Sequence, residues 1–390
     1  MGAIEQVEAE LAARPRSWLV TGAAGFIGSH LVERLLSRGQ SVIGLDNFAT
    51  GSEDNLRDVL ARVGPEAFRK LRVIEGDIRD LAACRKACAG ADIVLHQAGL
   101  GSVPRSLEDP LTTHQVNVDG FLNLIIAARD AGAPRFVYAT SSSVYGDAPG
   151  RSKVEHQIGS ALSPYALSKR IDELYAQIFS RAYGVETIGL RYFNVFGPRQ
   201  DPRGPYAAVI PRWIATLSRG DTCVIFGNGQ TSRDFCHVEN VIQANLLAGV
   251  AAPGSPAVDQ IFNVGVGKPT TLSRLFVLIR DRLAARGLPD VGDAKPIHQP
   301  FRPGDVRHSK PDTSKAEELL GYRPCRSLAS GLEETIEWFV RRAGNGSAPR
   351  RSHLAGSSAR NNSLRAEPSM SEVKSTYRPS EENLAKVYKV

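Results

Sequence analysis

The sequence predicts an α/β protein: a Rossmann-like, doubly wound parallel sheet with a smaller mixed α/β substrate-binding part. Short apolar runs alternate with helical segments of roughly 10 to 20 residues, which is typical of parallel strands joined by helices. Such crossovers are nearly always right-handed, so a Rossmann-like strand order is expected. A glycine-rich turn also lies directly between the first strand and the helix after it, where such sheets bind ligands.

The expected elements follow from the spacing of apolar residues. A short helical extension is expected over 1–15 and a dinucleotide-binding domain over 16–194. Expected strands cover 17–22, 41–47, 71–77, 91–98, 135–143 and 185–193, and expected helices include 25–39, 120–132 and 165–184. Glycine and proline become frequent after residue 194, so 195–342 is expected to be mainly the substrate-binding part, interlaced with the first domain.

The composition excludes several classes of function. The net charge of +7 comes mostly from residues 341–390, whose ten Lys or Arg and four Glu supply +6, so the body offers no basic face to nucleic acid. The segment 343–390 has few large apolar residues and is expected to be a disordered basic tail. No apolar run approaches the roughly 18 residues of a membrane-spanning helix, and the first residues do not form a signal peptide.

The cysteines predict a reducing compartment. There are five of them, they form no CxxC motif, and they come without an export signal, so we expect reduced thiols in the cytoplasm. Cys84 and Cys88 stand one helical turn apart, but no nearby His or Cys completes a metal site. Ordinary packing is therefore expected for this pair, and no metal is expected.

The glycine-rich turn predicts a cofactor site. Gly22 allows a tight turn, Gly25 lets the backbone approach a pyrophosphate, and Gly28 lets the helix pack against the sheet. Asp46 ends the second expected strand, about 18 residues beyond Gly28. Its carboxylate can accept hydrogen bonds from the adenosine ribose and would repel a 2′-phosphate, and Asn47, not an arginine, follows it. NAD is therefore favoured over NADP.

A second motif predicts acid–base chemistry. Tyr165 and Lys169 are four residues apart at the opening of a long helix, so their side chains share one face. A free tyrosine has a pKa of about 10, and a neighbouring cation favours its phenolate. Taken alone such a pair is common on helix surfaces. Here the segment 140–143, with Ser141 and Ser142, ends a strand about 20 residues earlier, at the edge where doubly wound sheets place ligands.

These motifs resemble the extended short-chain dehydrogenase/reductase family. The resemblance covers roughly residues 15–342 and is closest to bacterial UDP-N-acetylglucosamine 4-epimerases. It is carried by TGAAGFIGSH, LDNFATG, GDIRD, SSSVYGD, SPYALSK and LRYFNVFGPRQDP. The helix that precedes SWLVTG also resembles an extension of those enzymes.

The resemblance implies NAD as cofactor and a role for each matching position. Tyr165 would be the base, Lys169 its electrostatic partner, which also binds the ribose, and Ser141 or Ser142 a proton relay. The implied cofactor-binding residues are Gly22, Gly25, Phe26, Ile27, Gly28, Asp46, Asn47, Thr50, Gly51, Asp77, Ile78, Gln97, Ala98, Tyr165, Lys169 and Tyr192. The implied substrate-binding residues are Gly101, Ser102, Ser142, Tyr165, Asn194, Gln200, Ala208, Val209, Arg233, Arg302, Asp305 and Ser309.

The implied reaction is reversible 4-epimerisation of UDP-N-acetylglucosamine to UDP-N-acetylgalactosamine through a 4-keto sugar. The acetylated sugar is indicated by the family position that admits or blocks a bulky 2-substituent, where this chain has the small Ser309. The set Gly101, Ser102, Ser142, Asn194, Gln200 and Ala208 also matches residues associated with that preference.

Other functions stay open at this point. The main alternative is a UDP-glucose 4-epimerase or an epimerase of mixed specificity. A 4,6-dehydratase would want an acidic pair where Ser142 and Ser143 stand, and a uronate enzyme would need a dedicated cation that we cannot identify. A non-catalytic NAD-binding regulatory protein is a remote alternative, because this chain keeps both Tyr165 and Lys169.

The resemblance also implies a homodimer formed through a helix bundle. The expected helix 165–184 carries Leu167, Ile171, Leu174 and Ile178 along one side. These residues face either a second copy or the protein's own sheet.

Overall fold

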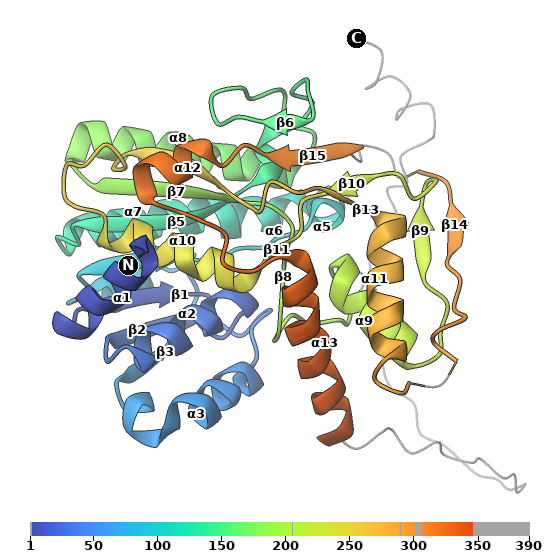
Figure 1. The fold of residues 1–390 in the computed structure, drawn as a ribbon. Coiled ribbons are helices and arrows are strands. Elements are labelled where there is room, and N and C mark those ends of the chain that lie inside the picture. Colours follow the sequence, from blue (N-terminus) through green and yellow to red (C-terminus); the bar gives the residue numbers. More distant parts are fainter. Residues whose placement is uncertain (1, 205, 289, 302–305, 346–390) are drawn as a thin grey trace, which may run out of the picture. The chain divides into compact units, whose positions relative to one another are not determined.

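A seven-stranded sheet, all of whose pairings are parallel, organises the computed structural model, which describes residues 2–204, 206–288, 290–301 and 306–345 (Figure 1). Its order is β12-β7-β5-β4-β1-β2-β3, so the predicted Rossmann-like fold is confirmed. The strands are β1 (Ser17–Thr21), β2 (Ser41–Asp46), β3 (Leu71–Glu75), β4 (Ile93–His96), β5 (Arg135–Ser141), β7 (Glu186–Tyr192) and β12 (Gln260–Val264).

Helices cover both faces of this sheet, because its central strands bury side chains on both sides. On β1, Trp18 and Val20 point into one core while Leu19 points into the other. The first core is closed by α1 (Ala3–Ala13), α2 (Phe26–Ser37), α3 (Glu53–Phe68), α10 (Val238–Val250) and α12 (Ser314–Leu320). The second is closed by α4 (Leu81–Cys88), α7 (Gly120–Asp130) and α8 (Pro164–Tyr183).

Residues after position 194 complete the sheet. Strand β12 pairs with β7, with Val264 opposite Tyr192, and α10 belongs to the core that covers β5 and β7. The described residues all fall in a single compact unit. The division of the chain into a cofactor domain and a substrate-binding part remains a prediction.

A third core holds the remaining long helices, at the right of Figure 1. Trp213 and Phe276 meet edge to face in it, with ring centroids 5.9 Å apart. Around it lie α9 (Val209–Ser218), α11 (Leu272–Ala284), α13 (Leu328–Asn345), β9 (Val224–Phe226) and β14 (Ile297–Gln299). No helix in the described ranges has the length and apolar character needed to cross a membrane.

Short elements connect these layers close to the carboxyl edge of the large sheet. A four-stranded sheet has the order β13-β10-β15-β6, and a two-stranded one joins β11 to β8. The short elements are α5 (Val103–Glu108), α6 (Pro110–His114), η1 (Gln115–Asp119), η2 (Ser142–Tyr145), β6 (Ser152–Lys153), β8 (Val195–Phe196), β10 (Ser232–Arg233), β11 (Cys236–His237), β13 (Thr270–Thr271) and β15 (His308–Pro311).

Candidate active site

The turn between β1 and α2 has the geometry that its glycines predict. Gly22 adopts a φ of +66° and donates its N–H to the Leu45 carbonyl at 2.8 Å. A Cβ on Gly28 would lie 1.9 Å from the Gly22 carbonyl oxygen, so any side chain there collides with the turn. The start of α2 therefore comes close to the turn, and its free N–H groups form a cradle for a phosphate.

Asp46 ends β2 beside this turn. Its carboxylate is 7% exposed and accepts hydrogen bonds from the N–H groups of Ala24, at 2.9 Å, and Phe48, at 2.8 Å. These contacts fix an acceptor-only group at the sheet edge, which fits ribose hydroxyls and opposes an added phosphate. The turn and this carboxylate together fit NAD.

A second acidic group lies further along the same edge. Asp77 accepts hydrogen bonds from Arg79 and, at 2.8 Å, from the Asn47 amide. The hydrogen bonds from Arg79 lower the pKa of Asp77 to about 2, so this group is ionised at neutral pH. Among the residues that contact Asp77, the one cation is Arg79, and it is paired with this carboxylate. This part of the site therefore favours a ribose hydroxyl over a 2′-phosphate.

A groove of about 650 Å³, here called the cofactor groove, runs along this edge and is within the size range of ligand sites. It is lined by twelve of the residues predicted to bind the cofactor: Gly22, Gly25, Phe26, Ile27, Gly28, Asp46, Asn47, Thr50, Asp77, Ile78, Gln97 and Ala98. The predicted Gly51 packs on the outer side of Asp46, where its Cβ would lie 2.9 Å from the Asp46 carboxylate.

A second hollow of about 300 Å³, here called the substrate pocket, adjoins the first. Ala207 and Ala208 line both, so one segment separates them. Of the residues predicted to bind substrate, Asn194, Ala208, Val209 and Arg233 line the substrate pocket, and Gly101, Gln200 and Ala208 line the cofactor groove.

The start of α8 places Tyr165 and Lys169 beside the loop 99–101, which lines the cofactor groove, although neither residue is among those that line the two hollows. Ser163 caps the helix by accepting the N–H of Ala166 at 3.1 Å, and Pro164 follows at the first position. The Tyr165 hydroxyl comes within 4.0 Å of the position a Cβ would take on Gly101, and the Lys169 ammonium within 3.6 Å of that on Gly99. Phenol and ammonium thus face the same short loop.

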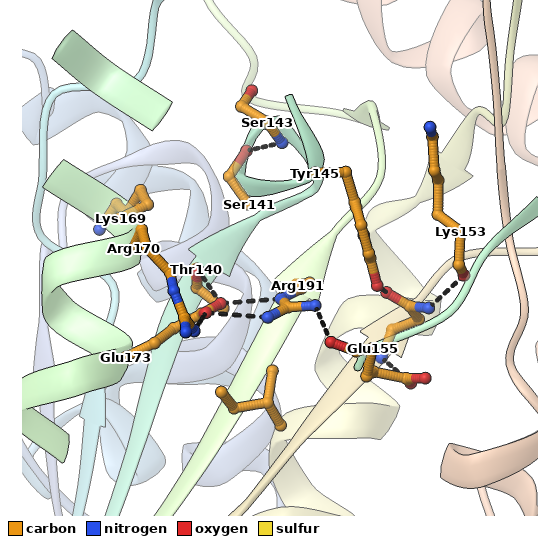
Figure 2. A network of polar contacts seen from close by, with 12 residues as sticks. Thr140, Ser141, Ser143, Tyr145, Lys153, Glu155, Lys169, Arg170, Glu173 and Arg191 are labelled. Atoms are coloured by element: carbon orange, nitrogen blue, oxygen red, sulfur yellow. Dashed lines mark hydrogen bonds and ion pairs between the residues drawn. The ribbon is translucent and has the colours of Figure 1, made fainter. Parts of the chain in front are cut away.

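Ser141 ends β5 next to this helix, in view in Figure 2. It is buried, and its hydroxyl accepts the N–H of Ser143 at 3.1 Å, which caps the short helix η2. The hydroxyl still has its own proton to donate. Ser142 starts η2 and is half-buried.

Two side chains that the sequence analysis did not single out hold the segment 97–100, beside Tyr165 and Lys169. Asn117 accepts the N–H of Leu100 at 2.8 Å and donates to the hydroxyl of Ser168, on α8, at 3.0 Å. It lies in η1, a π-helical turn of the kind often found at functional sites. Thr21 likewise bonds the N–H groups of Gln97 and Ala98 and the ring of His96.

Several other predicted residues line neither hollow in the described part of the chain. Tyr192 faces α10, and its hydroxyl bonds Gln97 and Asn245 at 3.0 and 2.8 Å. Ser309 lies on β15 directly opposite Arg233 of β10. Ser102 caps α5. Arg302 and Asp305 lie outside the described residues.

A contact joins two segments that line the cofactor groove. Tyr206, on the segment before α9, hydrogen-bonds the carboxylate of Glu108 at the end of α5. The Arg105 guanidinium lies over the Tyr206 ring, 4.8 Å from its centroid. Arg105 and Tyr206 both line the groove, so this contact joins α5 to the segment 206–208 at the groove's wall.

The fold and this site define a dinucleotide-dependent enzyme, with a tyrosine and a lysine beside a loop that lines the cofactor groove. The chain matches the NAD dependent epimerase/dehydratase family over residues 18–265, and it belongs to that family. Its cofactor is NAD.

Several proteins named as nucleotide-sugar 4-epimerases are similar to this chain. The chain is 38% identical over 322 residues to a UDP-glucose 4-epimerase of Mycolicibacterium smegmatis, covering 82% of this chain and 97% of that protein. It is similar to the structure of a UDP-N-acetylglucosamine 4-epimerase of Methanobrevibacter ruminantium in complex with UDP-N-acetylmuramic acid. That pair has a TM-score of 0.76 and 36% identity and covers 84% and 99% of the two chains. It is also similar to the structure of a UDP-glucose 4-epimerase of Thermus thermophilus in complex with NAD, with a TM-score of 0.71 and 32% identity. That match covers 83% of this chain and 99% of the other.

Proposed function

We propose that this protein interconverts UDP-N-acetylglucosamine and UDP-N-acetylgalactosamine by reversible epimerisation at carbon 4. The broader activity, 4-epimerisation of UDP-hexoses, is supported by 4-epimerases that are similar in sequence or in structure. This chain covers 97% to 99% of each of those proteins. The observation that carries the chemistry is the convergence of the Tyr165 phenol and the Lys169 ammonium on the glycine loop 99–101.

The chain's own residues supply the proton chemistry. Tyr165 takes the proton of the sugar's 4-hydroxyl, and Lys169 favours the phenolate that this requires. Ser141 donates a hydrogen bond to the reacting oxygen and relays the proton. Bound NAD would supply the acceptor for the hydride of carbon 4 and its return. Arg233 suits the diphosphate, because a guanidinium binds phosphate oxygens in pairs.

Ser309 supports the acetylated substrate. The residue is half-buried and small, and β15 holds it in register with Arg233, which lines the substrate pocket. We infer that this small side chain leaves room for a 2-acetamido group, which a tyrosine at the same position would exclude.

The substrate test uses purified protein without added NAD. UDP-N-acetylglucosamine and UDP-glucose are incubated separately, and their 4-epimers are followed by anion-exchange chromatography. We expect conversion of the acetylated sugar, and we expect Ser309→Tyr to lower its kcat/KM at least about tenfold while UDP-glucose changes little, since only the larger 2-substituent meets the added ring. Ser232, also on the short sheet, provides the matched control Ser232→Thr.

The result also separates this proposal from its alternatives. Conversion of UDP-glucose alone would favour the UDP-glucose 4-epimerase reading and contradict the role given to Ser309. Conversion of neither sugar, even with NAD supplied, would contradict the proposed epimerase and return a dehydratase, a uronate enzyme or a non-catalytic NAD-binding protein to consideration.

We also propose a homodimer. On α8, Leu167, Leu174 and Ile178 are 51%, 42% and 54% exposed, while Ile171 is half-buried. Leu107 and Leu111, on α5 and α6, are 61% and 66% exposed. The helices α5 and α6 both pack against α8. Large apolar side chains gathered on packed helices indicate an interface, and a second copy of α8 would form the bundle that the family resemblance implies.

The oligomeric state is measured by size-exclusion chromatography with light scattering. We expect a dimer, and we expect Ile178→Lys to give a monomer at micromolar concentration, because the lysine would bury an unpaired charge. Leu60→Lys, at a residue 38% exposed on α3, should leave the dimer intact. A monomeric wild-type protein would contradict the proposal.

The thiols are in keeping with a cytoplasmic location, which we also propose. All five cysteines are unpaired. Burial raises the pKa of Cys84 and of Cys88 to about 12, so both stay protonated and act as packing residues.

A further inference from the structure

Asp172 is a buried carboxyl group that the proposed mechanism does not use. It lies on α8, one turn after Lys169, and is 0% exposed. One carboxylate oxygen, Oδ2, accepts a hydrogen bond from the Lys169 ammonium at 3.1 Å. The other, Oδ1, is buried without a hydrogen-bond partner among the residues described. Burying a carboxyl oxygen without a hydrogen bond costs free energy, so packing alone does not explain an acid at this position.

The Lys169 ammonium is held between two acceptors. Besides Asp172 it donates to the Ala139 carbonyl at 3.1 Å, at the end of β5. These two bonds fix the ammonium beneath the loop that Tyr165 faces. The carboxylate also offsets part of the positive charge that favours the phenolate. We propose that Asp172 is a positioning residue, which holds Lys169 in place and sets how strongly its charge promotes ionisation of Tyr165.

Two ionisable groups near Asp172 stay uncharged around neutral pH, and a third is held in an ion pair. On β5, burial raises the pKa of Tyr138 well above its ordinary value. On β4, burial lowers the pKa of His96, which is close to Lys169, to about 3. On α8, Glu173 is paired with Arg170 and with Arg191 of β7. Burial raises the pKa of Asp172 to about 7, against the opposing effect of Lys169. Asp172 therefore gains its negative charge as the pH rises through neutrality.

The sign of its effect follows from the charges. Above about pH 7 the Asp172 carboxylate disfavours a second negative charge on Tyr165, so it raises the pH at which the base forms. Asp172 and Tyr165 are seven positions apart on one helix, roughly 10 Å along its axis. At that distance inside a protein, one charge shifts a pKa by about one unit.

The experiment compares wild type with Asp172→Asn, which keeps the shape and the hydrogen-bond acceptor but removes the charge. This inference rests on the proposed base Tyr165, so the first readout needs no turnover. The ionisation of Tyr165 in the purified protein is followed by tyrosinate absorbance, with Tyr165→Phe as the blank. We expect the Tyr165 titration in Asp172→Asn to move about one pH unit lower.

The second readout is the pH profile of kcat/KM on whichever UDP-hexose the wild type converts. Above about pH 7, where Asp172 is charged in wild type, its acidic limb should move down by the same amount, which corresponds to a gain of about tenfold between that pH and the wild-type midpoint. Asp172→Ala removes both charge and contact and should show the same direction of shift in the absorbance titration. An unshifted titration in both folded variants would overturn the inference. If no sugar is converted, the proposed function fails while the absorbance result still decides the role of Asp172.

Discussion

Replacing Tyr165 by phenylalanine is expected to lower kcat about 10²- to 10⁴-fold, the usual contribution of a positioned acid–base group. The ring stays, so the first turn of α8, its Ser163 cap and the packing against the loop 99–101 are preserved. Only the hydroxyl that we propose takes the substrate proton is lost. The rate is measured by anion-exchange chromatography of the UDP-sugars, and bound NAD is quantified after the protein is denatured.

Tyr175→Phe provides the matched control. Tyr175 lies on the same helix and is half-buried against the second core, away from both hollows in the described part of the chain. Its variant should epimerise at the wild-type rate, and both variants should retain NAD. A Tyr165→Phe protein that keeps NAD and the wild-type rate would show that another group is the base. Loss of NAD with loss of rate would point to a binding role instead.

Local backbone geometry explains what the sequence could predict. Gly22, Gly25 and Gly28 are required by one turn of a few residues, and Asp46 follows directly from the end of the next strand. The pair Tyr165 and Lys169 is indicated by helical spacing together with the serines that end a strand about 20 residues earlier. These inferences need only residues close in the chain, and the Rossmann-like fold follows from the alternation of strands and helices.

The contacts that were missed depend on tertiary placement. Asn117 and Asp172 carry no local signal, since an amide or an acid on a helix is ordinarily exposed. They join the site only because η1 packs on α8 and because one side of α8 is buried against β5. The contact of Tyr206 with Arg105 and Glu108 joins segments about a hundred residues apart, and spacing offers no sign of it.

The position of α8, which carries Tyr165, also depends on a contact between residues from different elements. Glu173 on α8 and Arg191 on β7 form a paired salt bridge with two N–O distances of 2.8 Å, and their side chains are 0% and 1% exposed (Figure 2). Thr140 of β5 donates to the same carboxylate at 2.9 Å, and Arg170 does so at 2.9 Å. The cluster thus ties α8 to the ends of the two strands beside the site.

Replacing Arg191 by methionine is expected to lower the free energy of unfolding by about 3–5 kcal/mol. The variant leaves the Glu173 carboxylate buried with fewer partners, and it also removes the hydrogen bond to the Glu155 carbonyl at 2.9 Å and the contact with the Tyr145 ring. The measurement is equilibrium unfolding in urea of the purified protein, with the midpoint and slope compared to wild type.

Two further variants make that result specific. Arg57→Met breaks an ion pair with Glu53 whose side chains are 67% and 70% exposed, so it should cost about 1 kcal/mol or less. Adding Glu173→Met to Arg191→Met should recover part of the lost stability, because the desolvated charge is removed and an apolar pair takes its place. A double variant less stable than Arg191→Met alone would mean that Glu173 acts mainly through Thr140 and Arg170. The cluster would then hold α8 through those bonds, with Arg191 as a lesser partner.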